Sequence, residues 1–421
     1  MNKTAIALAA DSAVTIESGT GLKVFRTVNK LFTLSKYHPV GVMIFGGASL
    51  NGVPWETIVK AYRQELHDQQ FTTIHEYASH FFEYLDRARN LFPEDQQERT
   101  FRSVLEREIY EIRRDIDERV REQFESAGTV GTDEIKAIVS ETIKDHHDRW
   151  TGAEELPDLP QGYADSVKQA YKEAARRTYR KALEKLPLTA ADKRRLEALP
   201  ALFVTRDVFN DSPSGVVIAG FGQDQLMPSL VRYSVDYVVE NRVKRKLERG
   251  YEITHDNPAV ITPFAQSEVV ATFMEGFDPQ LRANVEYYVK HLLEDASDVV
   301  LGHVGSAVSA APINVLEADL KKLVQAATES FEDLLSKLAR RHAEPIIYTV
   351  AVLPKDELAA MAEAMVNLTS FKRKVSLDEV ETVGGEIDVA VISKGDGFVW
   401  IKRKHYFDLD RNPLWLQNYY R

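Results

Sequence analysis

Asp11 ends an apolar run, Ile6–Ala10, that reads as a buried strand close to the start of the chain. A buried carboxylate is costly unless a cation or hydrogen-bond donors satisfy it, so Asp11 marks a site at which a partner is required. A second apolar run, Pro39–Phe45, closes on the glycine pair Gly46-Gly47. The sequence contains no cysteine, which excludes thiol nucleophiles and thiolate metal sites from the residues given.

The elements that would hold these residues come in runs of strands separated by runs of helices. β-branched and aromatic residues predict strands early in the chain, and helical spacing of apolar residues predicts helices after them. The expected strands are 4–15, 23–35 and 39–49, and the expected helices are 53–66 and 73–90. A charged block with Glu and Arg three and four residues apart, about 93–200, indicates helical arms.

Strand signals return in the second half of the chain. They cover 200–208, 214–222, 228–243 and 344–354, and a hairpin in 384–407 turns at Gly395-Asp396-Gly397. Helices are expected over about 280–342 and over 355–371. Because strands and helices are segregated rather than alternating, the pattern predicts the α+β class.

Composition narrows the classes of function. The chain has 421 residues and a net charge of −11, which argues against a general nucleic-acid binder with a basic face. No apolar run approaches the roughly 20 residues that cross a bilayer, and the apolar start is too short for a signal peptide. We therefore expect a cytoplasmic protein that inserts in no membrane.

Five pieces of the sequence, taken in order, resemble a proteasome β-type subunit and the ring-shaped bacterial peptidase related to it. They are AADS, RTVNKLF, the strand ending FGG, SGVVIAGFG with YSVD, and GGEIDVAVISKGDGFVWI. The resemblance implies the N-terminal-nucleophile hydrolase fold, a four-layer αββα sandwich of two antiparallel sheets. Residues 1–92, 200–279 and 343–421 would form this core, and 93–199 and 280–342 would be helical insertions.

The resemblance also implies a threonine-type peptidase or amide hydrolase. In that family the first residue of the mature chain attacks the amide carbonyl, and its own α-amino group is the general base. By motif, Lys30 would lower the proton affinity of the nucleophile, Asp11 would pair with and orient Lys30, and the Gly46 N–H would stabilise the oxyanion. No cofactor and no metal is implied.

The residues depart from the family pattern in two places. The strand that carries the nucleophile is missing before AADS, and Thr4 cannot replace it, because seven residues of strand separate Thr4 from Asp11 by roughly 23 Å. Val383 stands where the family has a serine, and Val380 where it has a carboxylate. Two explanations stay open: the chain as given starts after its nucleophile-bearing strand, or the protein is a catalytically inactive scaffold or assembly protein.

Partners follow from the same resemblance. We expect a homo-oligomer, ring-forming, that acts on peptides or proteins. The final triplet Tyr419-Tyr420-Arg421 resembles the tails with which ATPase rings dock on proteasomes, although packing of the aromatic tail on the core is a second interpretation. His146 and His147, with acidic neighbours, suggest a metal site at first sight; we expect a solvated helix face there instead.

Overall fold

The structure is a computed structural model that describes residues 1–18, 21–25, 27–210, 213–264, 267–305, 310–375, 384–405, 407–408 and 410–414. The chain divides into two compact units. The first contains residues 1–29 and 252–421, and the second contains residues 30–251. Both combine helices with antiparallel strand pairs, which confirms the predicted α+β class.

The second unit is built on a five-stranded sheet of order β10-β9-β8-β5-β4. The strands are β4 (Leu31–Thr33), β5 (Val40–Gly46), β8 (Ser214–Gly220), β9 (Ser229–Val239) and β10 (Arg242–Glu252). β5 pairs antiparallel with β8 from Val40↔Gly220 to Gly46↔Ser214, and β8 is buried along its whole length. Both strands are continuously apolar, which fits their place in the sheet with a neighbouring strand on each side.

Two helices, α1 (Trp55–Leu66) and α2 (Ile74–Arg87), pack their apolar faces onto this sheet. α2 begins where expected, because the Thr73 hydroxyl accepts a hydrogen bond from the Glu76 N–H. The short strands β6 (Ser49–Leu50) and β7 (Val53–Pro54) form the turn that leads from β5 into α1. The glycine end of β5 is thus held directly beside a helix start.

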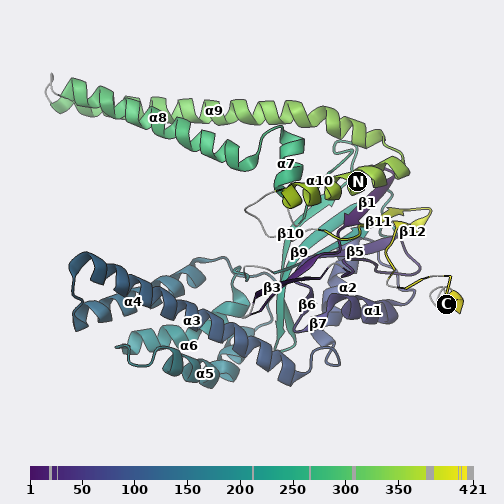
Figure 1. Ribbon diagram of the computed structural model, residues 1–421, viewed down its shortest axis with the longest axis horizontal. Helices are drawn as coiled ribbons and strands as arrows, with labels where there is room; N and C mark the ends of the chain where they lie inside the picture. Colours follow the sequence, from purple (N-terminus) through teal and green to yellow (C-terminus); the bar gives the residue numbers. More distant parts are fainter. Residues whose placement is uncertain are drawn as a thin grey trace. The chain divides into compact units, whose positions relative to one another are not determined.

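Four helices fill most of the remainder of the second unit, and Figure 1 shows them grouped together. They are α3 (Glu94–Ala127), α4 (Thr132–Gly152), α5 (Tyr163–Ala182) and α6 (Ala190–Thr205). The strand predicted over 200–208 is wrong, because α6 continues to Thr205. A capping box at Thr189 starts this helix, and Leu196, Leu199 and Phe203 lie buried at helical spacing, which outweighs the local β-branched composition.

The first unit joins the two ends of the chain. β1 (Ala5–Ala10) pairs antiparallel with β11 (Asp388–Ser393), which pairs with β12 (Gly397–Lys402) in the predicted hairpin. The helix α10 (Lys355–Val375) packs on β1 and β11. A separate hairpin consists of β2 (Val14–Ser18) and β3 (Gly21–Phe25).

Three further helices belong to this unit: α7 (Ser267–Glu275), α8 (Pro279–Gly305) and α9 (Ala310–Val352). The strand predicted over 344–354 is wrong, since α9 extends to Val352 with Pro345 inside it. Ile346, Ile347 and Val350 pack into one apolar cluster, and this helical spacing explains why tertiary contacts override the strand-like composition. Within the described part of the chain, no helix has both the length and the apolar character needed to cross a membrane.

The start of the first unit depends on the side chain of Asn2, which is completely buried. Its Nδ2 donates to the carbonyls of Val350 (2.9 Å) and Leu353 (3.0 Å). Its Oδ1 accepts from the Thr4 N–H (3.0 Å) and hydroxyl (2.8 Å) and from the Ala5 N–H (3.3 Å). One amide therefore ties the entry to β1 to the end of α9.

We expect Asn2→Ala to lower the free energy of unfolding by about 2–5 kcal/mol, because several buried backbone groups lose their partner. Urea unfolding followed by circular dichroism measures the change. The control is Lys3→Ala, whose Nζ makes only a surface contact with His255 at 3.5 Å. Equal stability of the two variants would contradict the role given to Asn2.

Candidate active site

Asp11 lies at the end of β1 and is bound by backbone amides. Its Oδ2 accepts hydrogen bonds from the N–H groups of Ala13 (3.1 Å) and Gly384 (3.0 Å). Next to it, the Ser12 N–H donates to the Gly384 carbonyl (3.2 Å), and the Ser12 hydroxyl donates to the Glu386 carbonyl. The structure thus brings the AADS and GGE segments together across 373 residues of sequence.

Lys30 and Gly46 lie at one end of the sheet in the second unit. The Ile44 N–H donates to the Lys30 carbonyl at 2.7 Å, so Lys30 lies opposite Ile44. Ile44 precedes Gly46 by two residues in β5. In an antiparallel strand, alternate N–H groups point to the same neighbouring strand. The Gly46 N–H therefore points to the β4 side of β5, beyond the level at which the described β4–β5 ladder ends. An amide in that position can donate to a ligand atom.

The backbone at Gly46 requires glycine. Its φ is +72°, in the left-handed region, and an added Cβ would lie 2.3 Å from the Pro213 carbonyl oxygen. The adjoining turn is fixed by Ser214, whose hydroxyl donates to the Gly47 carbonyl (3.0 Å) and accepts from the Trp55 Nε1–H (3.0 Å). Sequence reasoning missed Ser214; its signal is a serine that opens the fully apolar run of β8.

The three predicted site residues divide between the two units. Asp11 belongs to the first, whereas Lys30 and Gly46 belong to the second, so the Asp11–Lys30 ion pair stays a prediction. Thr4 precedes β1 and Asp11 follows it, and the Thr4 hydroxyl is bonded to Asn2. Val380, Val383 and the tail triplet Tyr419–Arg421 lie outside the described residues.

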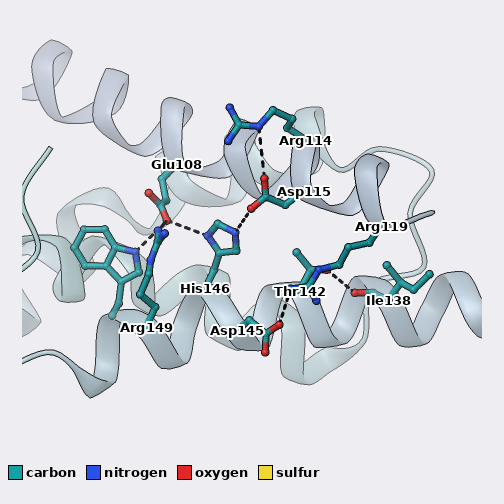
Figure 2. A network of polar contacts seen from close by, with 10 residues as sticks. Glu108, Arg114, Asp115, Arg119, Ile138, Thr142, Asp145, His146 and Arg149 are labelled. Carbon is teal, nitrogen blue, oxygen red and sulfur yellow. Dashed lines mark hydrogen bonds and ion pairs between the residues drawn. The ribbon is translucent and has the colours of Figure 1, made fainter. Parts of the chain in front are cut away.

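The helical block of the second unit contains a second polar cluster, and here the predicted solvated face is wrong for His146. Its ring is 8% exposed and lies between Glu108 (Nδ1 to Oε1, 3.2 Å) and Asp115 (Nε2 to Oδ2, 2.9 Å), as Figure 2 shows. Glu108 Oε1 also accepts from the Arg149 guanidinium (2.8 Å) and the Trp150 Nε1–H (3.0 Å). The helix periodicity of α3 and α4 could not show that these two helices pack with their polar side chains inward.

Electrostatics in this cluster favour the charged forms. Burial lowers the pKa of His146, but its hydrogen bonds to Glu108 and Asp115 outweigh burial and raise the pKa above the ordinary value. Burial raises the pKa of Glu108, and the bonds from His146, Trp150 and Arg149 bring it below its ordinary value. Among the described residues, no group of three or more His, Asp, Glu or Cys side chains is placed to hold a metal ion. The cluster is therefore an internal ion-pair network that joins α3 to α4.

A buried lysine joins the helical block to the sheet. Lys244 of β10 is 4% exposed, and its ammonium group lies over the rings of Phe209 (4.9 Å), Trp150 (5.4 Å) and Tyr237 (5.5 Å). Burial lowers its pKa to about 8, although Asp236 at 3.9 Å acts in the opposite direction. The cation–π contacts and the nearby carboxylate offset part of the cost of burying this charge.

Comparison with known proteins adds no relative. No protein-family profile, no curated protein and no solved structure matches this chain. The interpretation of the site therefore rests on the motifs and on the geometry of Asp11, Lys30 and Gly46.

We expect Gly46→Ala to destabilise the protein by about 2–4 kcal/mol, because the new Cβ meets a backbone oxygen and the positive φ disfavours any other residue. Urea unfolding measures the loss. Gly152→Ala is the matched control in the same unit, since nothing lies within 4 Å of an added Cβ there. An unchanged midpoint for Gly46→Ala would contradict the strained geometry of the β5 end.

The His146 network predicts a pH-dependent stability. The stabilisation from a His with a raised pKa is complete below its unfolded value, near 6.5, and is lost as the pH rises through the higher folded pKa. The stabilisation from Glu108 is complete above its unfolded value, near 4.5, and is lost as the pH falls through the lower folded pKa. The difference in unfolding free energy between wild type and His146→Gln should be largest between these limits, at about 3 kcal/mol.

Urea titrations at a series of pH values from 4 to about 9 test this. His67→Gln is the control, because the His67 side chain is 67% exposed and its contacts with Asp68 and the Tyr37 ring lie at the surface. A difference for His146→Gln that stays flat above pH 6.5 would show that His146 is neutral in the folded protein.

Proposed function

We propose that this chain is a proteasome-like peptidase or amide hydrolase of the N-terminal-nucleophile type. The observation that supports it best is the arrangement at the end of β5. There the Gly46 N–H points to the side of β4 but lies beyond the last described β4–β5 pair, and Lys30 lies opposite Ile44, which precedes Gly46 by two residues. An N–H in that position can donate to the oxyanion of a tetrahedral intermediate, and a cation beside it favours the anionic form of a nucleophile. Glycine is sterically required there, so the backbone conformation at this position is set before a substrate binds.

The proposed reaction is acyl transfer. A hydroxyl or thiol attacks the amide carbonyl, an α-amino group accepts its proton through water, and the amine product leaves with that proton. Water then cleaves the resulting ester or thioester and regenerates the nucleophile. In this proposal the nucleophile belongs to a residue outside the printed sequence, because Thr4 lies beyond the opposite end of β1 from Asp11. Asp11 is proposed to orient Lys30.

The proposal includes the architecture that the resemblance implies. The two sheets and their helices would form a four-layer αββα sandwich, and the chains would assemble into a ring in the cytoplasm that takes peptide or protein substrates. The proposal also includes an ATPase ring as the unfoldase partner.

One observation favours a second function, that of a catalytically inactive scaffold with the same fold. The Asp11 carboxylate accepts two backbone N–H groups and fastens the end of β1 to the segment before β11. A carboxylate used in this way supports the fold whether or not a reaction occurs nearby. In that case the role of Lys30 would be structural, through its backbone carbonyl, which accepts the Ile44 N–H at the end of the sheet.

Acylation by a β-lactone or a peptide epoxyketone distinguishes the two functions. We expect the native protein to form one covalent adduct, located by peptide mass spectrometry, and Lys30→Met to slow its formation by about 100-fold or more. Lys36→Met is the control, because Lys36 is an exposed lysine of the same segment. Absence of an adduct, or equal rates for Lys30→Met and wild type, would reject the enzyme and leave the scaffold.

A further inference from the structure

The hairpin of α8 and α9 in the first unit leaves large apolar side chains in water. Figure 1 shows the two helices side by side for most of the length of α8. α8 has 27 residues, yet none of its described side chains is buried. The contact between the two helices therefore covers only part of the apolar surface that the hairpin carries.

Five of the exposed apolar residues of α8 form one row along the helix, while Tyr287 and Val300 are exposed but lie outside this row. The residues of the row are Leu281 (56% exposed), Val285 (37%), Tyr288 (66%), Leu292 (53%) and Val299 (59%). Their spacings of four, three, four and seven residues keep them within about 60° of one another around the helix axis. This is the repeat with which a helix packs against another helix, and Asp295 at the one skipped position interrupts it.

α9 carries exposed leucines at the same heights along the hairpin as two residues of the α8 row. Leu323 (64% exposed) and Leu334 (51%) stand 13 and 24 residues from the start of α9, and Leu292 and Leu281 stand 13 and 24 residues from the end of α8. On each helix these positions lie roughly a quarter to a third of a turn from the partly buried positions that meet the other helix. The antiparallel arrangement then places both rows on one side of the hairpin.

We infer that this side of the hairpin docks on the same side of the hairpin in a second copy of the chain, forming an antiparallel four-helix bundle. The two rows present on the order of 1,000 Å² of apolar surface per chain, so two copies would bury about as much as a stable specific interface requires. A two-fold axis lets one apolar face meet its own copy without a second, complementary surface.

The charges of the hairpin favour this occupant over a polyanion or an anionic membrane. Residues 279–352 contain seven basic and ten acidic side chains, so the hairpin is slightly acidic. Several exposed charges pair within α9, as in Lys321–Glu317 (2.6 Å) and Lys337–Asp333 (2.6 Å). Charges of both signs that are already paired within the helix suit the edge of an interface between two identical surfaces.

Two adjacent tyrosines provide a matched test. Tyr288 belongs to the row, whereas Tyr287 is equally exposed, at 64%, but lies about 100° away around the helix. Light scattering coupled to size exclusion should give wild type and Tyr287→Glu at least twice the mass of one chain. Tyr288→Glu should reduce that mass by half or more at the same concentration while helical circular dichroism stays unchanged.

The absence of cysteine allows a second measurement. Tyr288→Cys should cross-link between chains with a short bismaleimide in high yield, and Tyr287→Cys should not. A monomeric wild type at tens of micromolar would overturn the inference and leave a different protein as the occupant. An oligomer that both glutamate variants leave intact, or equal cross-linking of both cysteine variants, would overturn it by placing the interface elsewhere.

Discussion

The antiparallel pairing of β1 with β11 is the constraint on which the first unit depends. Six residue pairs, from Ala5↔Ser393 to Ala10↔Asp388, join the two ends of the chain. Closing a loop of this length costs about 5 kcal/mol of chain entropy, a cost that rises only slowly with length. Each buried apolar side chain of β1, β11 and α10 contributes about 1.5–3 kcal/mol, so a few of them offset it. Residues 30–251 can therefore form a separate compact unit although they lie between β1 and β11 in the sequence, because the two strands still pair.

The same pairing explains why Asp11 occupies the tip of a buried strand. β11 is preceded by Gly384, and the Asp11 carboxylate accepts the N–H of that residue. The end of β5 is held by uncharged groups instead. The Ser214 hydroxyl donates to the Gly47 carbonyl, and the Trp55 Nε1–H donates to the Ser214 hydroxyl. Both strand ends are thus fixed by hydrogen bonds, which a site for acyl transfer would need and a scaffold would also have.

Local patterns predicted the elements whose own sequence decides their structure. β5 and β8 are continuously apolar, α2 has its Thr73 cap, and the last hairpin has its Gly-Asp-Gly turn. The patterns failed where distant contacts decide: Ile346 and Val350 are helical because they pack into an apolar cluster at helical spacing. For the same reason the sequence of α4 predicts a solvated His146, since nothing in α4 reveals that Glu108 and Asp115 of α3 lie opposite. Of the site, the residue types were predictable, whereas Ser214 and the direction of the Gly46 N–H required the register of the sheet.

The two helical blocks look alike in sequence but differ in how they satisfy their apolar residues. α3 to α6, together with β9, enclose a core in which Phe101, Ile109 and Phe203 have no exposed surface, because several elements can surround a side chain from all sides. α8 and α9 meet along one face only, so the apolar residues on their other faces stay at the surface. Charge pairs along the helices are common to both blocks and give little stability at exposed positions. The number of elements available to enclose a core, rather than charge patterning, therefore decides which block buries its apolar residues.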